Sequence, residues 1–212
     1  MNSFQNARPA HLLSRLILRL LGWKLEGPAL PASSFVLVGF PHTSNRDLLP
    51  GVLGPTAAGA RLRFLAKSEL FTGAKGSLIT LIGGVPVDRG GKARTVQAAV
   101  SLLSGPRPVA LGILPKGTRG QRTGWRSGFL HVARISGVPV VLCGLDYSHK
   151  RLIFSETFDP HDLDTLMDAA RSMATRCRGR RPEQDDTPVL AEEQGRAGDR
   201  SFSSMEVVLP AL

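Results

Sequence analysis

The sequence predicts a single α/β domain in which helices cover a mixed, largely parallel sheet, preceded by an amphipathic helix. The chain has 212 residues, a length typical of one domain that buries its own core. From about residue 34, short runs rich in β-branched residues alternate with helical stretches, the order that produces parallel sheets. Most of these runs are apolar throughout, which indicates strands covered on both faces.

The first expected element is a helix over residues 11–25. Its leucines and isoleucine recur at helical spacing, whereas Arg15, Arg19 and Lys24 fall on the opposite side. The segment is too short and too charged to cross a bilayer. A basic amphipathic helix flanked by Trp23 fits a membrane interface, and a helix packed against the domain explains the same pattern.

Six strands are expected after this helix, at residues 34–40, 61–66, 83–88, 108–115, 138–147 and 151–158. The clearest helices are predicted over residues 92–104 and 125–136, with a last one opening near residue 158. In this last helix Asp159 is predicted to be the N-cap, and Pro160 lies in the first turn.

Hydrophobic patterning divides the chain into three segments. Residues 1–30 are predicted to form a membrane-interface segment, and residues 31–177 the α/β domain. Residues 178–212 are polar, carry charges of both signs and lack a sustained hydrophobic period. This last segment is therefore expected to be a disordered or loosely attached tail.

The charge balance is strongly basic, because 27 Lys and Arg face 17 Asp and Glu, for a net charge of +10. Such a surface attracts anions, which include nucleic acid, anionic lipid and phosphorylated metabolites. The aromatic content of 6% and the dispersed arginines disfavour a nucleic-acid-binding module. That alternative predicts salt-dependent DNA or RNA binding that survives loss of His42. The two cysteines form no disulfide framework, as is typical of a reducing cytosol.

Several familiar catalytic motifs are missing from the sequence. There is no Gly-x-Ser-x-Gly elbow for a serine hydrolase and no Gly-x-Gly-x-x-Gly after a predicted strand. The five histidines lack metal-ligand spacing, so no metal site is expected. The stretch 112–118 has the two glycines of a phosphate loop at the right distance, but Thr118 and Arg119 follow the second glycine where Lys and Ser/Thr are required.

The strongest remaining candidate is the stretch PHTSNRD, residues 41–47. If His42 precedes a helix and Asp47 lies in its first turn, the two side chains can meet. The carboxylate then fixes the tautomer of the imidazole and raises its basicity, so that the ring can remove a proton from an alcohol. A His-Asp pair at a helix start can also be purely structural.

Two further stretches place cations at the ends of predicted strands, namely GGVPVDR with Arg89 and LPKGTR with Arg119. The carboxyl ends of parallel strands line the ligand crevice of an α/β sheet. We therefore expect His42, Arg89 and Arg119 in one region, where a base would lie beside two guanidinium groups suited to a phosphate.

Together, four stretches resemble the four sequence blocks of the glycerolipid acyltransferase family, which includes the 1-acylglycerol-3-phosphate acyltransferases. In order they are PHTSNRD, GGVPVDR, LPKGTR and GVPVV, and FLAKSELF at residues 64–71 resembles the family's connecting segment. The resemblance extends from about residue 35 to residue 147, roughly half of the chain.

The resemblance implies that His42 is the general base that deprotonates an acceptor hydroxyl and that Asp47 orients it. The hydroxyl would attack the thioester carbonyl of acyl-CoA or acyl carrier protein without an acyl-enzyme intermediate. Arg89 and Arg119 would hold the acceptor phosphate.

Other implied features concern substrates and location. Lys116, Gly117 and Thr118 would belong to the same substrate-binding pocket as the two arginines. The expected partners are a lysophospholipid such as 1-acylglycerol-3-phosphate, the acyl donor and an anionic membrane surface, without nucleic acid. No cofactor is expected beyond the acyl donor as co-substrate. The resemblance also implies a peripheral location at the cytoplasmic face of the membrane.

Two residues depart from the family pattern. Lys116 stands where the third block usually has glutamate, and Arg46 stands where short members usually carry an aromatic residue. Both changes add positive charge near the candidate base. Either the enzyme uses an acceptor with more negative charge or a different hydroxyl geometry, or catalysis has weakened and the domain serves as a lipid-binding or membrane-scaffold protein. The intact candidate His, Asp and Arg residues favour activity.

Overall fold

The computed structural model describes residues 9–88, 91–117, 124–185 and 187–191. In this part of the chain seven strands form one sheet in the order β1-β7-β6-β2-β5-β3-β4. The strands are β1 (Lys24–Glu26), β2 (Phe35–Phe40), β3 (Leu62–Lys67), β4 (Gly84–Val87), β5 (Ala110–Ile113), β6 (Val140–Asp146) and β7 (Arg151–Phe158). Strands β2 to β6 are parallel, β7 is antiparallel to β6, and β1 is parallel to β7. The predicted α/β fold with a mixed, largely parallel sheet is confirmed.

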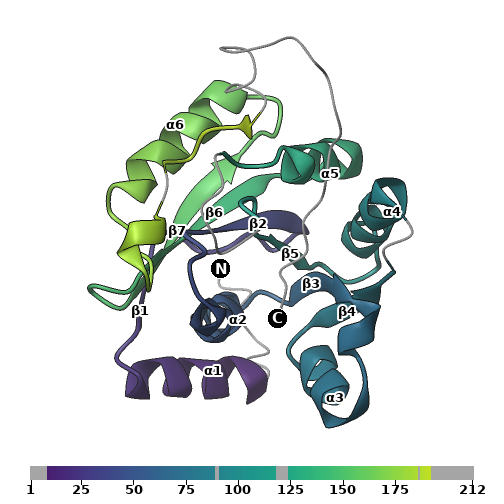
Figure 1. Cartoon of the computed structure of the whole chain (residues 1–212), viewed down its shortest axis with the longest axis horizontal. Coiled ribbons are helices and arrows are strands. Elements are labelled where there is room, and N and C mark those ends of the chain that lie inside the picture. Colours follow the sequence, from purple (N-terminus) through teal and green to yellow (C-terminus); the bar gives the residue numbers. More distant parts are fainter. Residues whose placement is uncertain (1–8, 89–90, 118–123, 186, 192–212) are drawn as a thin grey trace, which may run out of the picture.

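The helices form a layer on each face of the sheet (Figure 1). Figure 1 shows α1, α2 and α3 below the sheet and α4, α5 and α6 above it. They are α1 (Pro9–Leu20), α2 (Leu48–Ala57), α3 (Gly73–Leu81), α4 (Lys92–Leu103), α5 (Gly128–Ser136) and α6 (Leu163–Ala174). Side chains of β2 alternate between the two cores, with Phe35 and Leu37 on the α1 side and Val36 and Val38 on the other. This double burial explains why the central strands read as apolar throughout.

All six predicted strands are present, and an additional strand, β1, begins within the range predicted as the N-terminal helix. Helix α1 ends early because Gly22 has a φ of 78°. The amides of Gly22 and Trp23 bond to the carbonyls of Arg19 and Leu18, an arrangement that closes helix ends. The chain is then free to pair β1 with β7.

The predicted start of the last helix is wrong. Asp159 does not cap α6, because its carboxylate accepts a hydrogen bond from the His161 amide in a preceding turn, at 2.8 Å. The N-cap is Asp162, whose side chain accepts from the amide of Thr165. The turn separates Pro160 from the helix, which opens at Leu163.

Residues 178–185 and 187–191, in the segment that the sequence predicts as a loose tail, contact the domain. The amide of Tyr147 bonds to the carbonyl of Arg178 at 2.8 Å, and the amide of Arg181 bonds to Thr43 Oγ1 at 3.1 Å. Leu190 is buried and forms an isolated parallel β-bridge with Trp125 through main-chain hydrogen bonds. These contacts hold the segment against the edge of the sheet where β2 and β6 end.

Candidate active site

The loop between β2 and α2 brings His42 and Asp47 together. Nδ1 of His42 lies 3.1 Å from Oδ2 of Asp47, and both side chains are buried. His42 precedes the helical segment as predicted, whereas Asp47 belongs to a short 3-10 turn, η1 (Asn45–Asp47), that leads into α2. Ser44 caps this turn and fixes the chain between the two residues.

Hydrogen bonds keep Asp47 ionised. Besides His42, Oδ2 accepts from the amides of Thr43 and Ser44, each at 2.8 Å. Burial raises the pKa of Asp47, but the hydrogen bonds from His42 and from the Ser44 and Thr43 amides, together with the nearby polar hydroxyl of Tyr147, outweigh burial and hold the pKa below its usual value. An ionised carboxylate at Nδ1 selects the imidazole tautomer that carries hydrogen there, which leaves Nε2 able to accept a proton.

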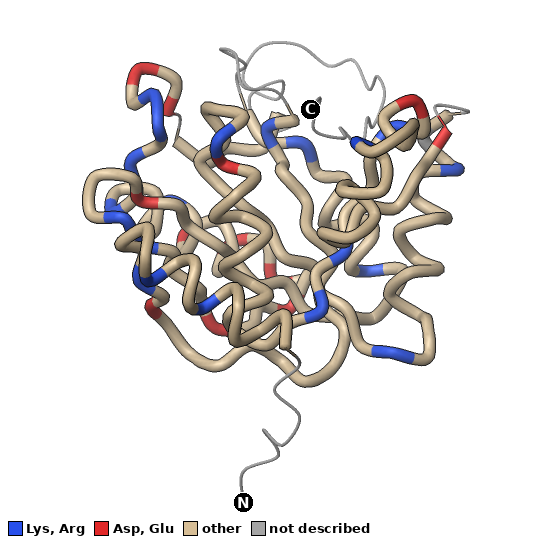
Figure 2. The backbone as a smooth tube through the Cα atoms, turned by 90° about the horizontal axis from the view of Figure 1, so that it is seen from below, with Lys and Arg blue, Asp and Glu red and all other residues tan. Residues whose placement is uncertain are grey.

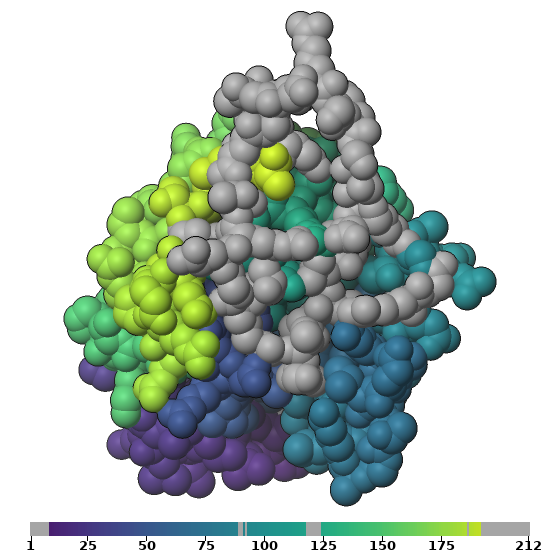
Figure 3. All heavy atoms as spheres, in the orientation of Figure 1, coloured from purple at the N-terminus to yellow at the C-terminus, as the bar shows by residue number. Residues whose placement is uncertain are grey.

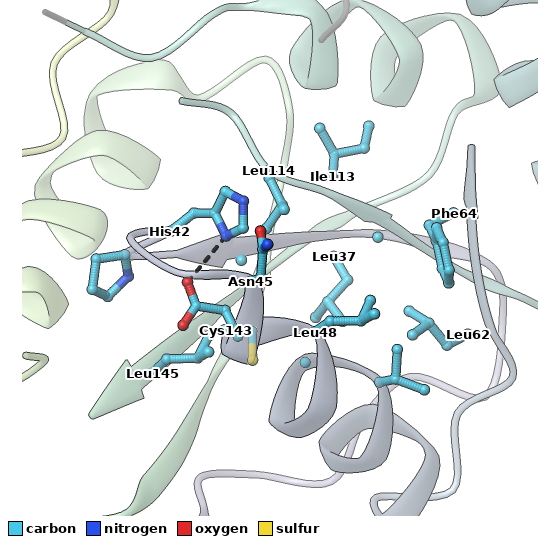
Figure 4. Close-up of a pocket in the computed structure, with 16 residues that line it drawn as sticks. Leu37, His42, Asn45, Leu48, Leu62, Phe64, Ile113, Leu114, Cys143 and Leu145 are labelled. Carbon is cyan, nitrogen blue, oxygen red and sulfur yellow. Dashed lines mark hydrogen bonds and ion pairs between the residues drawn. The ribbon is translucent and has the colours of Figure 1, made fainter. Parts of the chain in front are cut away.

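An apolar cavity of about 100 Å³ adjoins this pair, between α2 and the sheet (Figure 4). Figure 4 shows leucine and phenylalanine side chains around the cavity and the imidazole of His42 at one end. The lining includes Leu37, Leu48, Val52, Leu62, Phe64, Ile113, Leu114 and Leu145. The polar residues of the lining, His42, Asn45 and Asp47, all come from the loop after β2. A proton acceptor therefore stands beside a space suited to a hydrocarbon chain.

Cys143 also lines the cavity, but its thiol is a poor nucleophile. Burial, with a smaller contribution from Cys177, raises the pKa of Cys143 well above its usual value. The thiol therefore stays protonated, and thiols react as thiolates.

The predicted substrate-binding residues are described in part. Lys116 and Gly117 follow β5 at the carboxyl edge of the sheet, which is also where His42 follows β2. Lys116 is 3% exposed, and its Nζ donates to the main-chain oxygen of Gln184 at 2.6 Å. Arg89, Thr118 and Arg119 lie outside the described residues.

A second His-Asp contact, which the sequence did not single out, lies at the turn between β6 and β7. Nδ1 of His149 is 2.8 Å from Oδ2 of Asp146, and the side chain of His149 is 70% exposed. The same buried carboxylate accepts two hydrogen bonds from Arg151. Neither His149 nor Asp146 lines the cavity, so this contact is a structural ion-pair network.

Among the described residues, no group of three or more His, Cys, Asp or Glu side chains is placed to hold a metal ion.

Comparisons with known proteins cover the part of the chain that contains His42 and Asp47. A family model described as acyltransferase matches residues 25–145, which include His42, Asp47 and Lys116. The crystal structure of the 1-acyl-sn-glycerophosphate acyltransferase PlsC from Thermotoga maritima is similar in fold, with a TM-score of 0.55 and 18% sequence identity. The similarity covers 80% of this chain and 76% of that chain. No curated protein matches the sequence.

Proposed function

The chain belongs to the acyltransferase family, and from this premise we propose that it moves a fatty acyl group from acyl-CoA or acyl carrier protein to a hydroxyl of a lysophospholipid such as 1-acylglycerol-3-phosphate. One observation carries the proposal. His42, held by Asp47 at 3.1 Å, stands at the polar end of a cavity that is otherwise lined by apolar side chains.

The proposed reaction is a direct transfer. Nε2 of His42 removes the proton from the acceptor hydroxyl as its oxygen attacks the thioester carbonyl. The tetrahedral intermediate collapses, the carbon-sulfur bond breaks, and the leaving thiolate takes the proton back from the imidazolium. Asp47 stabilises the imidazolium while it exists. The protonated, buried thiol of Cys143 supports a mechanism without an acyl-enzyme intermediate.

The cavity is proposed to take the acyl chain. Each methylene that leaves water contributes about 0.8 kcal/mol, so a chain lying between α2 and the sheet would bind and orient the thioester near His42. Gly39 and Gly112 on the strands line this space without side chains.

The acceptor phosphate is proposed to bind Arg89 and Arg119, with Lys116, Gly117 and Thr118 in the same pocket. The support is the sequence order: β4 ends at Val87, two residues before Arg89, and Lys116 and Gly117 follow β5 at the edge of the sheet where His42 follows β2. The net charge of +10 favours anionic partners in general. Figure 2 shows Lys and Arg spread over many elements instead of forming one stripe.

A peripheral position on a membrane, at its cytoplasmic face, is proposed for the side of the molecule that carries α1. Leu12, Leu13, Leu16 and Leu20 are between 53% and 77% exposed, whereas Ser14 and Leu18 face the domain. Helix α1 thus turns most of its leucines outward, which favours an interfacial helix over an ordinary packed one. None of the described helices is long and apolar enough to span a membrane.

Transfer of labelled palmitate tests the proposal. Wild type, His42→Ala and His131→Ala are assayed with palmitoyl-CoA and palmitoyl carrier protein on a panel of lysolipids, and circular dichroism checks folding. His131, an exposed residue of α5, is the matched control. We expect transfer to one lysolipid that His42→Ala abolishes and His131→Ala preserves.

Two outcomes contradict the proposal. Transfer that survives in His42→Ala removes the histidine from the reaction. Folded wild type that transfers from neither donor, yet binds anionic vesicles, is instead a catalytically weakened member that acts as a lipid-binding or membrane-scaffold protein.

A further inference from the structure

Two buried polar atoms near His42 lack hydrogen-bond partners among the described residues. One is Oδ1 of Asp47, and the other is the hydroxyl of Tyr147. The other oxygen of Asp47 accepts three hydrogen bonds, from His42 and two main-chain amides. A buried carboxylate with three hydrogen bonds to one oxygen and none to the other is unusual, because buried polar groups nearly always have hydrogen-bond partners.

Tyr147 is placed beside Asp47 by the sheet. It follows β6 directly, and β6 pairs with β2 so that Gly144 lies opposite Phe40. The two chains therefore leave the sheet side by side, one toward Tyr147 and the other toward His42. Tyr147 lies outside the residues matched by the family model, which end at 145.

Two contacts fix the tyrosine ring and its main chain. The edge of one ring meets the face of the other between Trp23 and Tyr147, with centroids 5.0 Å apart and planes at 85°. The Tyr147 amide bonds to the carbonyl of Arg178. The hydroxyl is thus presented by a side chain with little freedom to turn away.

The hydroxyl is suited to donate and unsuited to lose its proton. Burial raises the pKa of Tyr147 far above its usual value, and the neighbouring charge of Asp47 raises the pKa further. Arg180 and Arg46 act in the opposite direction without reversing the shift. Tyr147 therefore remains a neutral phenol beside an ionised carboxylate.

On the basis of the proposed function, we propose that Tyr147 is a positioning residue whose hydroxyl donates to Oδ1 of Asp47 and so holds the carboxylate in place against His42. The two groups lie close enough for the charge of Asp47 to raise the pKa of Tyr147, so we expect the hydrogen bond in the free protein as well as during the reaction. Asp47 would then be held at both oxygens, and the imidazole would keep its orientation while it gains and loses a proton.

Removing the Tyr147 hydroxyl should have effects that differ from removing the packing of its ring. In Tyr147→Phe the ring stays on Trp23, but Oδ1 of Asp47 loses its hydrogen-bond donor. The carboxylate then holds a protonated His42 more firmly, so the acid limb of the pH-rate profile moves to higher pH. We expect kcat to fall about threefold to thirtyfold, given the usual strength of hydrogen bonds to charged groups. KM should change less than twofold, because Tyr147 does not line the cavity.

The experiment compares wild type, Tyr147→Phe and Ser136→Ala. Ser136, at the end of α5, also carries a buried hydroxyl without a partner among the described residues, so it controls for deleting such a group away from the site. Acyl transfer is measured against pH for kcat and KM. In parallel, the imidazole signals of His42 are followed by NMR through a pH titration without substrate. The charged groups near the pair, Arg46 and Arg180, are unchanged in all three proteins.

The acyl-transfer assay and the NMR titration together distinguish failure of this inference from failure of the proposed function. An active wild type whose kcat and acid limb are unchanged in Tyr147→Phe overturns the inference and leaves the acyltransferase proposal standing. A raised KM with unchanged kcat also overturns it, because Tyr147 would then bind substrate. If wild type transfers no acyl group, the proposed function fails and the NMR titration decides. If the midpoint of the His42 titration is higher in Tyr147→Phe than in wild type, the hydrogen bond from Tyr147 to Asp47 is supported. An unchanged midpoint overturns the inference.

Discussion

The ammonium group of Lys116 lies 2.6 Å from the main-chain oxygen of Gln184. Lys116, which stands where the family resemblance leads us to expect glutamate, is buried and contacts residues 178–185 through this hydrogen bond. The same segment contacts Thr43, the neighbour of His42, through the amide of Arg181. In Figure 3 the yellow-green atoms of this segment lie against the blue atoms of the chain that follows β2. Lys116 thus joins the end of β5 to a later part of the chain beside the site.

Lys116→Glu should destabilise the protein. The substitution sets a carboxylate against a main-chain oxygen in a buried position, so we expect the free energy of unfolding to fall by about 2–4 kcal/mol. Activity on 1-acylglycerol-3-phosphate should not rise. Urea denaturation and the transfer assay measure both effects, and Lys116→Met controls for loss of the ammonium alone. A stable Lys116→Glu protein with higher activity would show that Lys116 limits the choice of acceptor.

Asp47→Asn should nearly abolish acyl transfer. The amide lacks the charge that stabilises an imidazolium and can select the wrong tautomer of His42, so we expect kcat to fall by roughly a factor of 10²–10⁴. Asp168→Asn is the matched control, because this carboxylate is 77% exposed and pairs with Arg171 on α6. Equal rates in the two variants would exclude Asp47 from the mechanism.

The lowered pKa of Asp47 predicts a specific loss of stability in acid. The folded carboxyl binds a proton at lower pH than the unfolded one, whose reference value is 3.8. The contribution of Asp47 to the free energy of unfolding is complete above the unfolded pKa and is lost as the pH falls through the folded pKa. Below the reference value, ΔG of unfolding for Asp47→Asn should depend on pH less steeply than for wild type, by up to about 1.4 kcal/mol per pH unit. Urea unfolding between pH 6 and 3 gives both slopes. Asp146, whose pKa is also lowered, is common to both proteins, so its effect cancels. Equal slopes would mean that Asp47 is not held ionised.

A larger side chain at Gly51 should shorten the acyl chain that the protein accepts. Gly51 lines the cavity from α2, and among the described residues no atom lies within 4 Å of a Cβ added there. In Gly51→Leu we expect kcat/KM for palmitoyl-CoA to fall about tenfold or more relative to decanoyl-CoA, since fewer methylenes can be buried. Gly51→Ala controls for the backbone and should stabilise α2 by about 1 kcal/mol. An unchanged chain-length preference would place the acyl chain elsewhere.

The sequence predicted those features that local pattern determines. Apolar runs covered on both faces marked the central strands, and small polar residues around Ser44 marked the turn that brings His42 and Asp47 within 3.1 Å. The 3-10 turn that holds Asp47 was not distinguished from the first turn of a helix, because both begin with the same capping residues.

Features that depend on distant pairing could not be predicted. Strand β1 has three residues with no alternating pattern, and it exists because it pairs with β7, more than 120 residues later. The partner of Lys116 lies 68 positions away, in a segment whose composition is typical of a loose tail. Tyr147 gave a weak signal, as a polar aromatic residue at the end of a strand, and its relation to Asp47 required knowing that β6 lies beside β2.

The outward leucines of α1 should control binding to membranes. Leu16 and Leu20 are 53% and 77% exposed, and a leucine transferred from water to an apolar phase contributes about 1.5–3 kcal/mol. We expect Leu16→Gln with Leu20→Gln to weaken binding to anionic vesicles at least about tenfold. The control is Ile135→Gln, because Ile135 is 54% exposed on α5, on the opposite face of the sheet. Vesicle co-sedimentation at low and high salt separates apolar insertion from attraction between charges. If Ile135→Gln weakened binding as much as the double variant, or if neither did, α1 would not be the attachment site. Transfer to a short-chain, water-soluble lysolipid should survive in the double variant, since the substitutions lie outside the cavity of His42 and Asp47.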